Sequence, residues 1–218
     1  MIDLPTAEQL KDSCQALPLF PLPKVVLIPN TLLRLHIFEP RYVQLLQDCL
    51  QKDRIMVIPQ LVPGNMDLGN PPIFSTAGMG YVIHSEEQMD DRYNIVLLGL
   101  GRVKIVEEVS SDRMYRIARG DLLEDIIPDE NVWEPKLNML RVLLSQLCIH
   151  NRDLSSILEP LLNSDISAAQ FINTLAHLVH RDPTKRQQFI EEDNLMLKAQ
   201  LVEDALHLVL LSGNGINE

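Results

Sequence analysis

The chain has 218 residues, of which 46% are hydrophobic and 22% are charged, so the composition predicts a globular protein with one compact domain or two small ones. Its formal net charge of −11 argues against nucleic-acid binding as the main role, because that affinity depends largely on Lys and Arg neutralising phosphates. Cys14, Cys49 and Cys148 are far apart and form no CxxC pair, which predicts neither a disulfide framework nor a thiolate zinc site.

The first residues, MIDLPTAEQLKDS, contain no basic stretch followed by an apolar one, and no apolar run approaches membrane-spanning length. We therefore expect a cytoplasmic protein that does not partner a membrane. Residues 7–11 could form one or two helical turns on the surface.

The segment of residues 17–50 combines strand, turn and helix signals without interruption. Residues 25–28 form a β-branched run closed by a Pro-Asn turn, which predicts a short strand. Residues 32–38 predict a second strand, in which Leu35 and Ile37 face the core while Arg34 and His36 face solvent.

A helix is predicted to begin at Pro40, since proline suits the first helical turn and Glu39 adds a negative charge near its positive end. Helical spacing then gives one apolar stripe, formed by Tyr42, Leu45, Leu46, Cys49 and Leu50.

The ordered motifs PLFPL (18–22), VVLIP (25–29) and LHIFEPRY (35–42) resemble the opening signature of the amino-terminal domain of Lon proteases. The same signature is found in cereblon and in small stand-alone proteins, and a stand-alone form is expected here. A weaker resemblance continues into the helical half at Asp182-Pro183 and Arg186-Gln187. We interpret the residues that carry the motif as mainly structural: Phe20, Pro21, Pro29, Phe38, Glu39, Arg41, Tyr42, Gly80, Gly99 and Arg102.

This resemblance implies an α+β fold, with a PUA-like mixed β pseudo-barrel followed by a C-terminal helical bundle, and a role in polypeptide recognition. Glu39 and Arg41 could also belong to a recognition surface, but a helix start that begins with proline explains these residue types by itself.

Residues 55–60 predict a buried strand, and residues 61–77 form a Pro- and Gly-rich loop that is long for a compact domain. Such a loop either carries function or only joins two strands. Its apolar side chains are expected to be exposed, which makes Met66 and Phe74 candidate anchors for a bound polypeptide.

A hairpin is predicted over residues 78–100, with a polar tip at residues 86–93 that adds Met89 and Tyr93 as candidate binding residues. Gly99 and Gly101 predict a bend or bulge before further strands at residues 103–105 and 115–119. The result would be a mixed barrel of six or seven strands.

The composition changes from strand to helix at the polar hinge of residues 128–131, so we expect domains at 1–127 and 128–218. The first helix has a stripe formed by Leu137, Leu140, Leu144 and Leu147. Helices are also expected over residues 167–180, with a capping box, and from Asp182-Pro183. A last helix over residues 194–211 should bury Leu197, Leu201, Ala205 and Leu208.

The sequence contains no GxxxxGK[ST] phosphate loop and no GxSxG nucleophile motif, and we expect no enzyme activity, no cofactor and no metal. His177 and His180 could share a metal with His207 or Glu203, but surface histidines beside an apolar stripe are the commoner case. The acidic run Glu86, Glu87, Asp90 and Asp91 is interpreted as a solvated hairpin tip.

The sequence therefore predicts a non-catalytic protein that binds unfolded or partly exposed polypeptides, with a separate protease or ATPase as a further candidate partner. The alternatives are a PUA-like RNA-binding module, an accessory factor of an ATP-dependent protease, and a hydrolase acting alone, which no motif supports.

Overall fold

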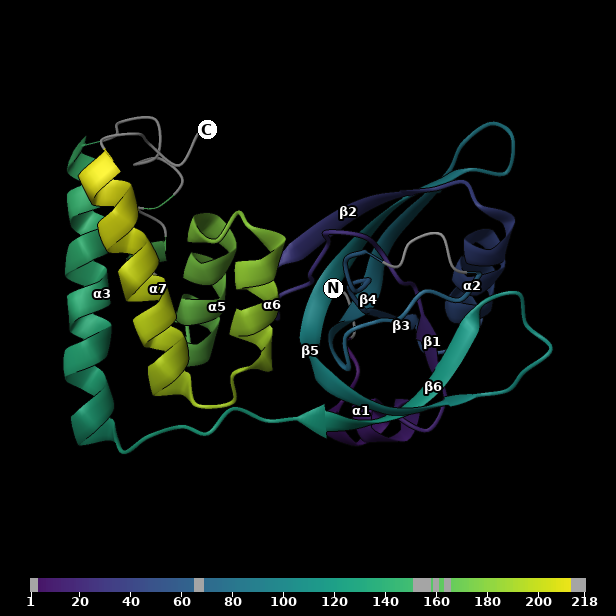
Figure 1. The fold of residues 1–218 in the computed structure, drawn as a ribbon, viewed down its shortest axis with the longest axis horizontal. Coiled ribbons are helices and arrows are strands. Elements are labelled where there is room, and N and C mark those ends of the chain that lie inside the picture. The colour runs from purple at the N-terminus through teal and green to yellow at the C-terminus, as the bar shows by residue number, and fades with distance from the viewer. Residues whose placement is uncertain (1–3, 65–68, 151–157, 159–160, 163–165, 213–218) are drawn as a thin grey trace. The chain divides into compact units, whose positions relative to one another are not determined.

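The computed structural model describes residues 4–64, 69–150, 158, 161–162 and 166–212. The chain divides into two compact units, Met1–Glu124 and Asp125–Glu218. Within the described residues, the first unit holds six strands and two helices, and the second holds four helices (Figure 1). The expected α+β class, a mixed sheet followed by helices, is confirmed.

The strands of the first unit close into a ring. Their order is β2-β5-β4-β3-β1-β6, and an additional pairing of β5 with β6 joins five of them into a barrel to which β2 is added. The β1–β3 pair is parallel and the others are antiparallel. The bounds are β1 Leu17–Leu19, β2 Leu32–Ile37, β3 Ile55–Ile58, β4 Thr76–Glu87, β5 Tyr93–Val109 and β6 Arg116–Leu123.

Strand β5 has 17 residues and belongs to both parts of the sheet (Figure 1). Its first half pairs with β2 and its second half with β6, while β4 lies along its other edge. The sequence predicted two strands here, and this was wrong because the chain bends without breaking. The bend coincides with a register shift after Met79, where Gly80 pairs with Gly99.

Residues 25–28, predicted as a strand, form a buried segment without regular structure. Three glycines of the sheet make room for it. A Cβ on Gly78 would overlap the carbonyl oxygen of Leu27, and one on Gly99 would overlap the carbonyl oxygen of Ile28. A Cβ on Gly80 would lie 2.8 Å from Leu27 Cδ2. Val26 and Ile28 are buried at this close approach without pairing in the sheet, so their strand propensity misled the prediction.

Helix α2, Pro40–Leu50, begins as predicted, with Pro40 in its first turn. Its buried face consists of Tyr42, Leu45, Leu46 and Cys49, and these residues join a core cluster with Ile37, which is 1% exposed. Leu33 and Leu35 pack against the same cluster but are only half-buried. The predicted face of β2 is therefore confirmed, with its burial increasing toward α2.

Helix α1, Ala7–Ser13, lies on the surface with no buried residue and starts with a capping box between Thr6 and Gln9. The three-residue strand β1 follows it and was missed by the sequence reading, because Pro18 lies in its centre. Proline lacks the N–H that a strand ladder uses, yet both Leu17 and Leu19 are fully buried.

The loop between β3 and β4 is more ordered than its composition predicted. Leu61 forms an antiparallel bridge with Ile73, and the backbone N–H of Val62 donates to Pro72. The four apolar residues described here, Leu61, Val62, Ile73 and Phe74, are half-buried rather than exposed. Met66 and Leu68 lie outside the described residues.

The second unit consists of α3 Glu130–His150, α5 Ala168–Val179, α6 Pro183–Glu191 and α7 Leu195–Ser212. Helix α7 packs against both α3 and α5. The capping box of Ser167 and Gln170 and the Asp182 cap with Pro183 are present as predicted. Helix α3 buries its predicted leucine stripe but begins inside the expected polar hinge, where Asp129 accepts the backbone N–H of Asn131.

The buried face of α7 differs from the prediction. Leu197 and Leu208 are exposed by 51% and 68%, whereas the fully buried residues are Leu195, Ala199, Val202 and Leu206. The helix is apolar around most of its circumference, so spacing alone did not identify the face. Lys198 occupies the buried side because it pairs with Asp125 at 2.6 Å, and its ammonium lies 5.2 Å from the Phe189 ring centre.

Candidate functional site

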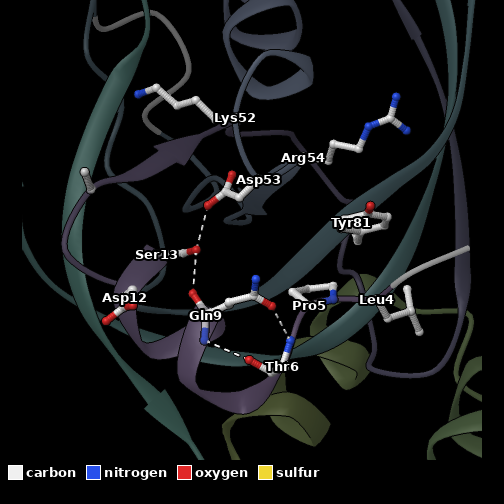
Figure 2. A pocket seen from close by; sticks show the side chains of 11 residues that line it. Leu4, Pro5, Thr6, Gln9, Asp12, Ser13, Lys52, Asp53, Arg54 and Tyr81 are labelled. Carbon is white, nitrogen blue, oxygen red and sulfur yellow. Dashed lines mark hydrogen bonds between the residues drawn. The ribbon is translucent and has the colours of Figure 1, made fainter.

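A hollow of about 670 Å³ lies between α1 and the turn that precedes β3 (Figure 2). Several of its polar side chains are hydrogen-bonded to one another. Ser13 Oγ donates to Asp53 Oδ2 at 2.6 Å, and Thr6 and Gln9 are engaged in the helix cap (Figure 2). The bond between Ser13 and Asp53 joins α1 to the barrel, so we assign the hollow a structural role.

A second cleft, of about 410 Å³, brings together four of the motif residues. We call it the motif cleft. It lies where the start of α2, the segment before residue 25, the loop after β3 and the start of β6 converge. Its lining residues are Pro21, Leu22, Pro23, Glu39, Arg41, Tyr42, Leu61, Gly69, Asn70, Pro71, Met114 and Arg116.

One wall of the motif cleft is a stack of aromatic and cationic groups. The rings of Phe20 and Tyr42 lie 4.2 Å apart between centres, and the guanidinium of Arg41 lies 4.5 Å from the centre of the Tyr42 ring. Arg41 also forms an ion pair with Glu39 at 2.7 Å. Burial raises the pKa of the Tyr42 hydroxyl, so the ring stays neutral and presents an apolar surface.

The opposite wall is fixed by Arg116. Its Nη1 donates to the carbonyl oxygen of Pro71 at 2.9 Å, and its Nε donates to Glu108 at 2.8 Å. Hydrogen bonding from Arg116 lowers the pKa of the Glu108 carboxyl, with a smaller contribution from Asn70. Arg116 thus ties the loop after β3 to the barrel.

Both arginines of the cleft are neutralised by a carboxylate of the same unit, and the remaining lining is rich in proline and leucine. The described lining residues include no Ser, Thr, Cys, His or Lys. The cleft is suited to binding apolar groups.

Three of the residues predicted as polypeptide anchors are described by the structure, and these three do not form one site. Phe74 precedes β4, whereas Met89 and Tyr93 follow it at the hairpin tip, at the opposite end of a twelve-residue strand. Met89 is 88% exposed, but Tyr93 is half-buried against the core cluster of α2. Met66 lies outside the described residues.

The motif residues differ in exposure: Phe38 and Arg41 are exposed and Glu39 is half-buried, whereas the others are buried. Phe20 and Arg102 are buried at 3% and 2% exposure, and Arg102 donates to the carbonyl oxygen of Glu124. Phe38, in contrast, is 62% exposed, with its ring 6.0 Å from that of His36. The sequence reading missed Met114, which is 57% exposed at the cleft, because an isolated methionine between strands carries no pattern.

The candidate metal-binding groups of the second unit have other roles. Glu203 pairs with Lys136, and His207 Nε2 lies 3.8 Å from its carboxylate. Burial, followed by the charges of Arg186 and Lys185, lowers the pKa of His180 to about 4. In the described part of the chain, no three His, Cys, Asp or Glu side chains are grouped as a metal site would require.

None of the helices that the structure describes is both long and apolar enough to cross a bilayer.

Comparison with known proteins gives a consistent result. A profile of the ATP-dependent protease La (LON) substrate-binding domain matches residues 16–207. Lon protease 2 of Myxococcus xanthus is 25% identical over 199 residues, covering 90% of this chain, and cereblon of Gallus gallus is 28% identical over 118 residues, covering 54%. The chain spans about a quarter of the length of these relatives, 24% and 26% respectively.

The fold is also that of known structures. The N-terminal domain of the Mycobacterium avium complex Lon protease superposes with a TM-score of 0.71 at 10% identity, with 88% of this chain and 98% of that chain covered. The Lon N-terminal domain protein of Xanthomonas campestris gives 0.63 at 20% identity, covering 87% and 98%. With most of its length matched by the profile, the chain belongs to the family of the ATP-dependent protease La (LON) substrate-binding domain.

Proposed function

We propose that this protein binds extended segments of other polypeptides, without catalysis of its own, and that the motif cleft is its binding site. The observation that supports the site most is the composition of the lining, which includes three prolines, two leucines and a methionine and has its charges already paired. A volume of about 410 Å³ is within the range of ligand pockets and accommodates large apolar side chains. The family description, a substrate-binding domain, supports the class of ligand.

A separate protease or ATPase is the proposed recipient of the bound polypeptide. The relatives named above include Lon proteases, while this sequence has no phosphate-binding loop. A protein of this kind would present an unfolded client to a partner.

The hairpin tip is a second candidate site because Met89 is 88% exposed there. Two matched substitutions separate the candidates: Met114→Gln changes the cleft and Met89→Gln changes the tip. Both side chains are exposed, so neither substitution should lower the stability of the fold. The probe is labelled, reduced and carboxymethylated lysozyme, which cannot fold, and the readout is fluorescence anisotropy.

We expect Met114→Gln to weaken binding roughly 5- to 30-fold, corresponding to about 1–2 kcal/mol for an interface anchor, and Met89→Gln to leave it unchanged. The reverse result would move the site to the hairpin tip. No binding by the wild-type protein would refute the proposed function. A parallel filter assay with single-stranded RNA should show no retention at physiological salt, given the net charge of −11.

A further inference from the structure

Strand β2 lies at the end of the strand order and pairs with β5 alone. The direction of its backbone groups follows from one hydrogen bond just before the strand, in which the N–H of Gly99 donates to the carbonyl oxygen of Thr31 at 2.9 Å. Hydrogen-bonded and non-bonded pairs alternate in an antiparallel ladder, and the register of β2 with β5 has no shift. Leu33, Leu35 and Ile37 are therefore the residues bonded to β5.

The intervening residues of β2 direct their N–H and C=O groups away from β5. For Arg34 and His36, no backbone partner of these groups exists among the described residues. Their side chains, like that of Leu32, are exposed on the solvent face. A strand laid beside β2 would satisfy these backbone groups and place its own side chains next to them.

We propose that the edge of β2 binds an extended segment of a client polypeptide by strand addition, with an acidic residue of the client opposite Arg34. This proposal rests on the proposed function and specifies how the client is held. Hydrogen bonds to a backbone are independent of client sequence, so the same edge can accept different unfolded chains.

The position of β2 supports this occupant. The strand ends at Ile37, and Glu39 and Arg41, a few residues further on, line the motif cleft. Phe38, between Ile37 and Glu39, has 62% of its surface exposed. The end of β2 is therefore within four residues, along the chain, of side chains that line the cleft.

Charge argues against a second copy of this protein as the occupant. In the antiparallel register that places Arg34 of one copy opposite Arg34 of the other, two guanidinium groups would face each other. Like charges directly opposite each other destabilise a strand pair, whereas a carboxylate opposite Arg34 stabilises it.

Amide hydrogen exchange of the full chain, followed by NMR, tests the proposal without any substitution. In the free protein, the amides of Leu33, Leu35 and Ile37 should exchange slowly and those of Arg34 and His36 rapidly. Saturation with reduced and carboxymethylated lysozyme should slow exchange at Arg34 and His36 at least 10-fold.

A matched pair of variants gives a second measurement. Arg34→Pro removes one outward N–H, at a position where an edge strand tolerates proline, while Arg34→Ala keeps it. We expect Arg34→Pro to bind the probe at least 5-fold more weakly than Arg34→Ala. If Arg34→Pro does not fold, the exchange experiment alone decides.

The possible results separate the two proposals. If the wild-type protein does not bind the probe, the proposed function and strand addition both fail. If it binds but exchange at Arg34 and His36 is unchanged, strand addition alone is refuted. If exchange at Arg34 and His36 becomes slower as the protein concentration rises, in the absence of the probe, a second copy is the occupant and the proposal is overturned.

Discussion

Substituting Gly78 with alanine tests the most specific packing feature of the barrel, the passage of the buried segment over the sheet. The added Cβ would lie 2.8 Å from the Cβ of Leu27 and overlap the Leu27 carbonyl oxygen. These are atoms of or next to the backbone, which cannot move aside as the end of a flexible side chain can. We expect Gly78→Ala to cost about 3 kcal/mol of unfolding free energy, the upper part of the usual range for overpacking.

Gly101→Ala is the control, since Gly101 pairs with Met79 in the same sheet. Its added Cβ would make only an ordinary contact of 3.5 Å with Leu122 Cδ1. A lower entropy of the unfolded chain should make this variant neutral or more stable, by up to about 1 kcal/mol.

The two units can be followed separately in one denaturant titration. The single tryptophan, Trp133, lies in the second unit, and all four tyrosines, Tyr42, Tyr81, Tyr93 and Tyr115, lie in the first. Near-UV circular dichroism of the tyrosines therefore reports the barrel. For an m-value of about 1.5 kcal/mol/M in urea, the expected loss lowers the midpoint by about 2 M. Equal midpoints for Gly78→Ala and Gly101→Ala would refute the close approach.

Three further outcomes are expected. The pKa of His180 in the folded protein is about 4, below its ordinary value of 6.5. The stability that the neutral imidazole allows is therefore fully present above pH 6.5, and the second unit should lose about 3 kcal/mol of unfolding free energy as the pH falls toward 4, measured by Trp133 fluorescence. An unchanged pH profile in His180→Asn would contradict this. Asp125→Ala leaves the ammonium of Lys198 buried without its carboxylate and should cost about 3–5 kcal/mol, more than Lys198→Met, in urea titrations. Burial, followed by nearby carboxylates, raises the pKa of the Cys49 thiol to about 12. A thiol reagent at pH 8 should therefore modify Cys49 only when denaturant is present. Rapid reaction in the native state would show instead that the thiol is accessible.

The elements that the sequence predicted well are those whose signals are local. The strand-to-helix transition at Pro40, the β4–β5 hairpin and the capping box at Ser167 depend on residues within a few positions of one another. Turn and cap chemistry determines such features before any tertiary contact forms.

The elements that the sequence misjudged depend on distant partners. Strand β1 contains Pro18 and exists only because β3 and β6 flank it. The segment at residues 25–28 has strand propensity but crosses the sheet where Gly78 and Gly99 lack side chains. Neither arrangement leaves a periodic pattern in its own segment, so propensity gave the wrong result.

The motif cleft was predictable only in part. The resemblance identified Pro21, Glu39, Arg41 and Tyr42, which all line it. The other wall comes from the loop after β3 and from Arg116, and their proximity depends on closure of the ring between β5 and β6. The sequence contains no local signal for that closure.

The closed ring has a consequence for the protein as it is being synthesised. Leu17 of β1 pairs with Ala118 of β6, a partner made 118 − 17 = 101 residues later. A ribosome adding roughly 5–20 residues per second needs roughly 5–20 s to supply it. Throughout that interval one edge of β1 has no strand beside it, and one edge of the second half of β5 is open from its own synthesis until β6 is made. Open edges of this kind pair readily with other chains. A nascent chain arrested before Arg116 would therefore need protection from aggregation that the completed barrel does not.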